Sequence, residues 1–165
     1  MASITLHGDP INTNGDLPAI GSAAPDFTLT TGDLADVSLA DYDGKKKLLN
    51  IVPSLDTGIC AISTKTFNES VAKHDDTVFL TISADLPFAQ GRFCEAENID
   101  KVQTLSTMRS ASFAEDYGIK IIDGPLAGIT GRAVVVLDES NKVIYTELVP
   151  EIAQEPDYDK ALASL

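Results

Sequence analysis

The sequence predicts an α/β domain in which short buried strands alternate with helices around one sheet. Short apolar runs recur along the chain, and segments with apolar residues at helical spacing lie between most of them. The length of 165 residues suits one domain, and no linker, repeat or low-complexity tract divides the chain. We therefore expect a single domain over residues 1–165.

The first expected elements are a hairpin and two short strands. The pattern alternates from Ile4 to Leu6, turns at residues 8–10 and resumes at Ile11, which predicts an N-terminal β-hairpin within about residues 1–20. Strand-like pieces follow at 27–29 and 37–39. Residues 47–52 then form the first strongly apolar run, which we expect to be a buried central strand.

The second half continues the alternation of helix and strand. In chain order, we expect a helix over 60–74, a strand over 78–82, a helix from Pro87 through Cys94, a strand over 102–105, a helix over 111–117, a hairpin of 133–137 and 143–148, and a last helix with Pro156 at its first position. This order is typical of a thioredoxin-like fold, with a central mixed sheet flanked by helices. Sites in α/β folds lie at the carboxyl ends of the strands.

The charge and hydropathy of the chain exclude several classes of partner. The formal net charge is −13 and the 12 Lys and Arg residues are scattered, whereas phosphate binding needs clustered cations, so we expect no nucleic acid. No apolar run reaches the length of a membrane span, and the start at Met1 lacks a secretory pattern. We expect a soluble, cytoplasmic protein without a membrane contact.

The cysteines, histidines and glycines do not form a recognised metal or cofactor motif. Cys60 and Cys94 are 34 positions apart, which rules out a Cys-x-x-Cys redox motif, and neither His7 nor His74 completes a zinc-like spacing. The glycine-rich residues 124–131 lack the features of a phosphate loop or a dinucleotide fingerprint and are expected to be a flexible connection. We therefore predict neither a metal nor a cofactor.

Cys60 stands where the central strand ends and the next helix begins. Free N–H groups at a helix N-terminus stabilise a thiolate, which is the nucleophilic form of cysteine, and they can also bind an incoming oxygen. Cys60 is therefore a candidate nucleophile, and the alternative is a small, buried, inert residue. A catalytic pair with His74 is excluded, because 14 residues of one helix separate the two by about 21 Å.

Three further residues have types suited to chemistry at Cys60. Thr57 precedes Cys60 by three, so its hydroxyl can reach the sulfur, although it can equally be the N-cap of the helix. Arg132 stands at the head of an apolar strand, where an arginine is commonly solvated, but its guanidinium can hold a thiolate and an oxygen together. Pro53 can end strand pairing and shape a pocket wall. Weaker candidates for the role of Arg132 are Arg92 and Arg109.

The spacing Pro53-x-x-x-Thr57-x-x-Cys60 resembles the active-site signature of the peroxiredoxins. Longer stretches narrow the likeness to the bacterial thiol peroxidase branch, and the likeness runs from about Gly21 to the C-terminus. These stretches are Asn50–Cys60, Ile82–Gln90, Arg92–Cys94, Leu105–Thr107, Asp123–Leu126 and Arg132–Val136.

The resemblance implies an enzyme that reduces hydrogen peroxide and organic hydroperoxides in antioxidant defence. Cys60 would be the peroxidatic cysteine and would pass through a sulfenic acid. Cys94, otherwise a small residue packed under aromatic rings, would be the resolving cysteine and form an intramolecular disulfide with Cys60. Thr57 and Arg132 would act in catalysis and, with Pro53, bind the substrate.

The resemblance also implies partners and a preferred substrate. Thioredoxin would reduce the disulfide, the protein would form a homodimer, and organic hydroperoxides would be preferred over hydrogen peroxide. Leu55, Ile59 and Phe88 are expected to line an apolar pocket, although core packing explains them equally well. We also expect local unwinding of both cysteine helices on oxidation, because a disulfide needs Cα atoms within about 7 Å.

Two other classes of protein remain open from the sequence. One is a redox-regulated binding or sensor protein, in which the disulfide changes a surface. The other is a thioredoxin-fold module with inert cysteines. Neither class requires Thr57 and Arg132 around Cys60, and the peroxidase interpretation is therefore favoured.

Overall fold

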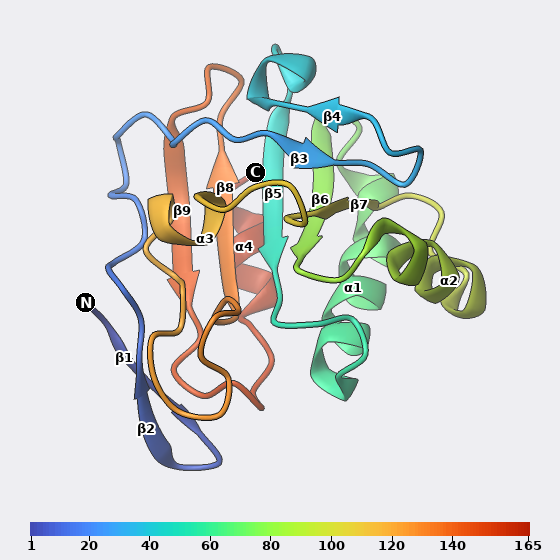
Figure 1. Cartoon of the computed structure of the whole chain (residues 1–165). Helices are drawn as coiled ribbons and strands as arrows, with labels where there is room; N and C mark the ends of the chain where they lie inside the picture. Colours follow the sequence, from blue (N-terminus) through green and yellow to red (C-terminus); the bar gives the residue numbers. More distant parts are fainter.

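A seven-stranded sheet in the order β4-β3-β7-β6-β5-β8-β9 forms the centre of the molecule (Figure 1). The computed structural model describes residues 1–165. The elements in chain order are β1 (Ser3–Leu6), β2 (Asp9–Asn12), β3 (Leu29–Thr30), β4 (Asp36–Val37), the 3-10 turn η1 (Leu39–Tyr42), β5 (Lys46–Ile51), α1 (Gly58–Ser70), the 3-10 turn η2 (Val71–Lys73), β6 (Thr77–Ser83), α2 (Pro87–Glu97), β7 (Gln103–Ser106), α3 (Phe113–Asp116), β8 (Ala133–Leu137), β9 (Val143–Leu148) and α4 (Tyr158–Ala163).

The strand directions bring two distant parts of the chain to the same edge of the sheet. β5 runs parallel to β6 and antiparallel to β8, and the register pairs Ile51 at the end of β5 with Ala133 at the start of β8. The chain that leaves β5 toward Cys60 therefore passes beside Arg132, which immediately precedes β8. This antiparallel register places Arg132 at the carboxyl end of β5.

The two faces of the sheet bury two separate apolar clusters. On one face, Leu49 and Ile51 of β5 pack with Phe113 of α3. On the other face, Leu48 packs with Phe67 of α1 and Ala161 of α4. Because both faces are covered, successive residues of β5 are buried, which explains why this strand is a continuous apolar run in the sequence.

The N-terminal hairpin forms a second, two-stranded sheet beside the main one. His7 and Gly8 form its turn with positive φ angles of 52° and 88°, a conformation that glycine adopts freely and that short hairpin turns require. Ile4 and Ile11 pack against Ile152 near the C-terminus. The hairpin is therefore held to the body by an apolar cluster of its own.

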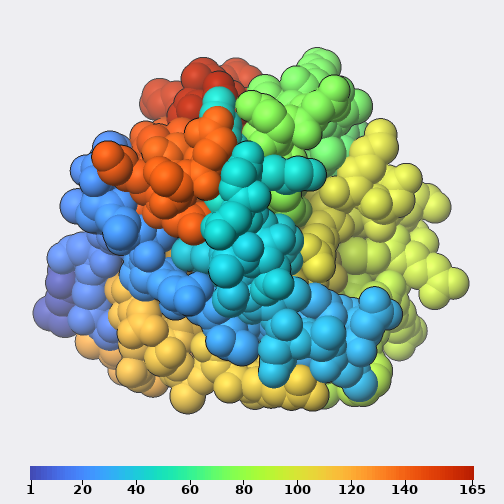
Figure 2. Space-filling model, turned by 90° about the horizontal axis from the view of Figure 1, so that it is seen from above, coloured from blue at the N-terminus to red at the C-terminus, as the bar shows by residue number.

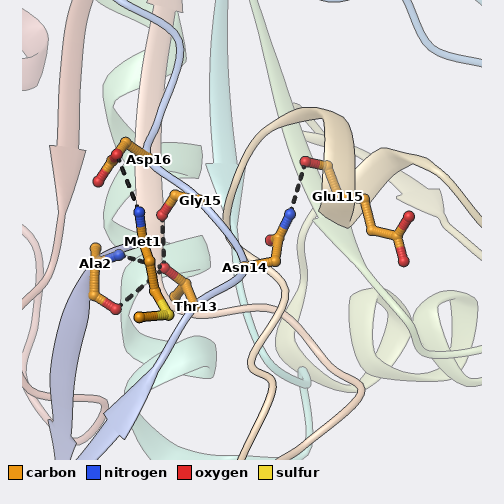
Figure 3. Close-up of polar contacts among 7 residues, drawn as sticks. All are labelled: Met1, Ala2, Thr13, Asn14, Gly15, Asp16 and Glu115. Atoms are coloured by element: carbon orange, nitrogen blue, oxygen red, sulfur yellow. Dashed lines mark hydrogen bonds and ion pairs between the residues drawn. The ribbon is translucent and has the colours of Figure 1, made fainter.

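Polar contacts fix the base of the hairpin to the main body (Figure 3). The N-terminal ammonium of Met1 lies 3.2 Å from a carboxylate oxygen of Asp16. The Asn14 side-chain amide donates a 3.1 Å hydrogen bond to the carbonyl oxygen of Glu115 in α3. The turn of the hairpin lies at its other end, at the lower edge of the molecule in Figure 1.

The opposite end of the molecule is covered by chain segments that precede β5. Figure 2 shows the blue and cyan segments crossing this end beside the orange β8–β9 turn.

No helix combines the length and the apolar character that a membrane crossing needs.

The predicted α/β class, the central mixed sheet and the N-terminal hairpin are confirmed. The prediction for the last helix was wrong at its start, because α4 begins at Tyr158 and Pro156 lies outside it. Asp157 is the N-cap, and its carboxylate accepts a 3.1 Å hydrogen bond from the Lys160 N–H, which is the usual function of an acidic cap. The helix expected over 111–117 is the short α3.

Candidate active site

Cys60 is the third residue of α1, at the end of the helix where backbone N–H groups are free. Thr57 is the N-cap, and the first helical bond runs from the Ala61 N–H to the Thr57 carbonyl oxygen at 3.1 Å. The N–H groups of Gly58, Ile59 and Cys60 precede that bond and have no acceptor within the helix. This positive end of α1 favours a negative charge on the sulfur.

Two polar side chains contact the sulfur of Cys60. The Thr57 Oγ1 atom lies 2.6 Å from Sγ, and the Arg132 Nη1 atom lies 3.2 Å from it. Cys60 itself is 0% exposed. A buried anion is costly unless it is paired and hydrogen-bonded, and this thiol has both kinds of partner at hand.

Arg132 is held in place by a backbone carbonyl group. Its Nε and Nη2 atoms donate to the carbonyl oxygen of Ile152 at 3.1 and 2.9 Å, and the residue is 1% exposed. The fork of two bonds to one oxygen orients the planar guanidinium so that Nη1 faces Cys60. Of its five N–H groups, two have no protein partner in these contacts and can bind a substrate oxygen.

The Thr57 hydroxyl has two acceptors within reach. Besides Sγ, the Ser54 carbonyl oxygen lies 2.9 Å from Oγ1. A hydroxyl has one hydrogen, so it can donate to only one of them at a time. Thr57 is the N-cap by position, but its side chain accepts no capping hydrogen bond. The hydroxyl can therefore donate to the sulfur of Cys60.

An apolar cavity of about 400 Å³ opens next to these residues. Its lining residues are Leu6, His7, Pro53, Ser54, Thr57, Gly58, Ile59, Leu126, Ile129, Arg132, Ile152 and Ala153. Three of the four residues expected around the peroxide, Pro53, Thr57 and Arg132, therefore line the cavity, whereas the buried Cys60 does not. A ligand in the cavity meets Thr57 and Arg132, the two side chains that contact the sulfur.

The expected apolar lining is correct for Ile59 and wrong for two other residues. Leu55 packs inward with Val52 and Cys60 in a small buried cluster. Phe88 is 69% exposed and lines a separate cavity along α2. The reason is the helix phase, because position 88 lies on an exposed face of α2, whereas Pro87 and Gln90 are its buried residues.

The loop between β5 and α1 is anchored by one carboxylate. Asp85 accepts hydrogen bonds from the Leu55 N–H at 2.7 Å, from the Ser54 hydroxyl at 2.8 Å and from the Ser83 hydroxyl at 2.7 Å. These bonds attach the loop that leads to Cys60 to the end of β6. The same short connection after β6 leads into α2 and Cys94.

Cys94 lies in a different environment on α2. It is half-buried and packs beside the cluster that includes Phe67 and Val102, and burial raises the pKa of its thiol although a hydrogen bond with Thr104 offsets part of that effect. Both cysteines are free thiols. Phe93 packs against this cluster and also against the cluster of Cys60, so it stands between the two sites.

The comparisons with known proteins identify the family of this chain. A family model described as Redoxin matches residues 19–162. Proteins named thiol peroxidase from Mycobacterium bovis and Mycobacterium tuberculosis are each 57% identical over 165 residues, which cover 100% of this chain and 99% of theirs. The chain belongs to the redoxin family, among its thiol peroxidases.

Solved structures give the same fold. A peroxiredoxin-like protein from Aquifex aeolicus superposes with a TM-score of 0.92 at 38% identity, covering 100% of this chain and 98% of that one. A thiol peroxidase from Chromobacterium violaceum gives 0.90 at 23% identity over 98% and 93% of the two chains, which shows the fold alone. The predicted family, thioredoxin-like fold and enzyme class, a peroxiredoxin-type oxidoreductase that reduces peroxides with thiols, are confirmed.

The weaker candidates from the sequence lie elsewhere in this thiol peroxidase. Arg92 lines the separate cavity along α2, and Arg109 forms a surface ion pair with Asp36 at 3.0 Å. His74 lies at the end of η2, as a residue near a helix C-terminus. His7, to which the sequence assigned no role, lines the cavity beside Arg132.

Sequence reasoning missed one wall of the cavity. Residues 124–131 were expected to be only a flexible connection, but Leu126 and Ile129 line the cavity, and the Gly128 N–H bonds to the Ile121 carbonyl oxygen at 2.8 Å. Apolar residues between glycines were the available signal. No sequence signal marks the carbonyl oxygen of Ile152, because every residue has a backbone carbonyl group.

Proposed function

We propose that Cys60 is the peroxidatic nucleophile of this thiol peroxidase. The observation that supports this role most directly is a buried sulfur contacted by both the Thr57 hydroxyl and the Arg132 guanidinium beside an apolar cavity. The thiolate attacks the terminal oxygen of the hydroperoxide and the O–O bond breaks. The sulfur becomes a sulfenic acid, and the departing oxygen takes a proton and leaves as an alcohol or as water.

The neighbours of Cys60 divide the work of this step. Arg132 stabilises the thiolate through Nη1, and its unpaired N–H groups bind the peroxide oxygens as negative charge moves onto the leaving oxygen. Thr57 donates to the sulfur before the reaction and to the bound peroxide during it. Pro53, which is buried and lines the cavity, shapes the wall against which the peroxide lies.

Cys94 resolves the oxidised enzyme in this proposal. Its thiol attacks the sulfenic sulfur, water leaves, and the Cys60–Cys94 disulfide forms. Cys60 and Cys94 lie on separate helices with Phe93 packed between their clusters, so α2 must unwind locally before the two sulfurs meet. A dithiol protein of the thioredoxin type then reduces the disulfide by exchange.

The proposed setting follows from the redox chemistry. Free thiols persist in a reducing compartment, so we propose that the protein acts in the cytoplasm, in antioxidant defence. We also propose a homodimer, in line with the resemblance to its branch. Sedimentation of the reduced protein at micromolar concentration tests this state, and a monomer mass would contradict it.

The cavity supports organic hydroperoxides as the preferred substrates. Its wall is built from apolar side chains such as Ile59, Leu126 and Ile129, and the polar groups gather where Thr57 and Arg132 stand. An apolar substituent gains free energy by leaving water for this wall, at about 25 cal/mol per Å² of apolar surface buried. Hydrogen peroxide lacks such a substituent. Equal kcat/KM values for cumene hydroperoxide and hydrogen peroxide would contradict the preference.

One mass measurement tests both cysteine roles. One equivalent of cumene hydroperoxide is added to the reduced protein and to Cys94→Ser, and intact masses are recorded against time. We expect the parent to lose two hydrogens and the variant to gain one oxygen at Cys60, much faster than a free thiol reacts. Unchanged masses would contradict a peroxidatic Cys60. Fast oxidation without turnover by reduced thioredoxin would instead favour a redox sensor.

A further inference from the structure

The tip of the N-terminal hairpin is bound by a single carboxylate, that of Glu151. This side chain accepts hydrogen bonds from the Thr5 hydroxyl at 2.6 Å, the His7 N–H at 3.0 Å and the Gly8 N–H at 3.1 Å. A fourth bond comes from the Ala153 N–H at 3.1 Å, within its own segment. The carboxylate thus joins the hairpin turn to residues 150–153.

The backbone continues this connection in both directions. The Thr5 N–H donates to the Pro150 carbonyl oxygen at 2.8 Å, and the Ile152 N–H donates to the Thr5 carbonyl oxygen at 2.9 Å. Ile152 therefore has its N–H bound to the hairpin and its carbonyl oxygen bound to Arg132. Its side chain is buried under Ile4 and Ile11. Every hydrogen-bonding group of this residue is engaged.

We propose that Glu151 is a positioning residue for Arg132. By fixing the hairpin turn and residue 153, the carboxylate holds the peptide of Ile152 in the one orientation that presents its carbonyl oxygen to Nε and Nη2 of the guanidinium. Arg132 is then aimed at the sulfur of Cys60. This role rests on the proposed function of Cys60, and it makes a hairpin remote in sequence part of the support of the active site.

The cavity shares the same support. Leu6 and His7 of the hairpin and Ile152 and Ala153 of the C-terminal segment line it together, and Glu151 joins the two sides. Loss of the Glu151 contacts is expected to widen the cavity as well as to release Arg132. The defect would therefore appear in the peroxide reaction and in the reactivity of the thiol.

The direction in which the reaction pH of Cys60 shifts distinguishes two effects of replacing Glu151: the loss of its negative charge and the displacement of Arg132. Replacing Glu151 by Gln removes a negative charge from the neighbourhood, which by itself would favour the thiolate of Cys60 and lower the pH at which the thiol reacts. Displacement of the Arg132 guanidinium removes a positive partner of the sulfur, so it raises the pH at which the thiol reacts. A rise in that pH therefore identifies the positioning effect.

The experiment uses the Cys94→Ser protein, so that alkylation reports only on Cys60. Glu151→Gln and Thr5→Val each remove part of the hydrogen bonding between the Glu151 carboxylate and the hairpin, and Asp123→Asn is the matched control. Asp123 also holds the hairpin, by accepting from the backbone N–H and the side-chain amide of Asn12 at 2.7 and 2.8 Å, but its carboxylate has no hydrogen bond to residues 150–153. The pKa of Glu151 is lowered to about 2 by the Thr5 hydroxyl and the backbone N–H groups, so a profile from pH 5 to 10 does not titrate it.

Iodoacetamide alkylation is followed over this pH range, together with the rate of oxidation by cumene hydroperoxide and the urea midpoint. For Glu151→Gln we expect the alkylation midpoint to rise by about one pH unit and the peroxide rate to fall about tenfold. Thr5→Val is expected to shift both in the same direction by less, and the double variant by less than the sum of the two. Asp123→Asn is expected to lower only the urea midpoint.

The outcomes separate this role from the proposed function. A parent whose Cys60 alkylates like a free thiol and reacts slowly with peroxide would remove the proposed function itself. If the parent is reactive, an unchanged or lowered midpoint in Glu151→Gln would contradict the positioning role. So would an equal rise in Asp123→Asn, because hairpin stability alone would then explain the change.

Discussion

Cys60 and Cys94 occupy opposite environments in the same fold. Cys60 is completely buried, yet a hydroxyl, a guanidinium and a helix N-terminus surround its sulfur. Cys94 is only half-buried, but its surroundings are apolar, and burial raises the pKa of its thiol. In the proposed mechanism, the more buried of the two thiols is therefore the reactive one. The reason is that its sulfur has polar and cationic partners.

The helices that carry the two cysteines differ in the same sense. Five residues of α1 are buried, including Cys60 and Phe67, whereas α2 buries only Pro87 and Gln90. Segments with few buried contacts open at lower free-energy cost than the core around them. The proposed mechanism thus places the peroxide at a helix that is well packed and the second thiol on a helix with few buried residues.

The largest effect in this comparison is expected at Arg132. Arg132→Met removes the cationic partner of Cys60 and leaves the Ile152 carbonyl oxygen without its donors, so the rate with cumene hydroperoxide should fall by roughly 10²- to 10³-fold. Stopped-flow measurement of the first oxidation provides the rate. Arg109→Met removes a surface ion pair with Asp36 and a hydrogen bond to the Leu34 carbonyl oxygen; it is the control and should react at the parental rate. Equal rates for all three proteins would remove Arg132 from the mechanism.

Thr57 is expected to rank second. Thr57→Val removes the hydroxyl beside Sγ but keeps the shape of the side chain, and the oxidation rate should fall about tenfold to a hundredfold. Thr57→Ser keeps the hydroxyl and should retain most of the rate. The Thr57 side chain makes no capping bond, so the Val variant should lose only the bond to the Ser54 carbonyl oxygen, about 1 kcal/mol of stability. A large loss of stability with an unchanged rate would show that Thr57 is only structural.

The two thiols should also differ in their response to pH. The raised pKa of Cys94 keeps it protonated at neutral pH, and its thiolate forms only as the pH rises beyond the ordinary value of 9.0. At pH 7 iodoacetamide should therefore modify Cys60 first, and Cys94 should follow only in alkaline solution or after unfolding. Peptide mapping measures both rates. Cys94 modified first at pH 7 would reverse the assignment of the two environments.

Asp85 is expected to have the smallest effect. Asp85→Asn keeps one acceptor oxygen but replaces the other with a donor amide, so a bond to Ser54 or Leu55 is lost and stability should fall by about 1–2 kcal/mol. The oxidation rate should fall only a few-fold, because the loop still ends at α1. Urea unfolding and stopped flow measure the two effects. An unchanged midpoint would show that the carboxylate does not anchor the loop.

The sequence predicted the parts of this arrangement that local patterns encode. Continuous apolar runs identified β5, β6 and β8, and the peroxiredoxin-like spacing identified Thr57 and Cys60. Arg132 was chosen on the resemblance to the peroxiredoxins, since an arginine at a strand start is commonly just solvated. The antiparallel register of β5 and β8 is what brings it to Cys60. The catalytic roles of these residues stay predictions.

Contacts between distant segments were beyond reach of the sequence. The carbonyl oxygen of Ile152 and the carboxylate of Glu151 find their partners, Arg132 and the hairpin turn, only in the folded protein. Phe88 was misplaced because an apolar residue type does not give the helix face that it occupies. Pro156 was misplaced for a similar reason, since proline is acceptable both inside the first turn and before the cap.

The most direct test of the account is amide hydrogen exchange of the reduced protein and of its Cys60–Cys94 disulfide form. We predict that α2, Pro87–Glu97, loses most of its protection on oxidation, that α1 loses it only near Cys60, and that α4 stays unchanged as the internal control. The reverse result, with α2 still protected and α1 open along its length, would contradict the account, because the site around Cys60 would then be the part that moves.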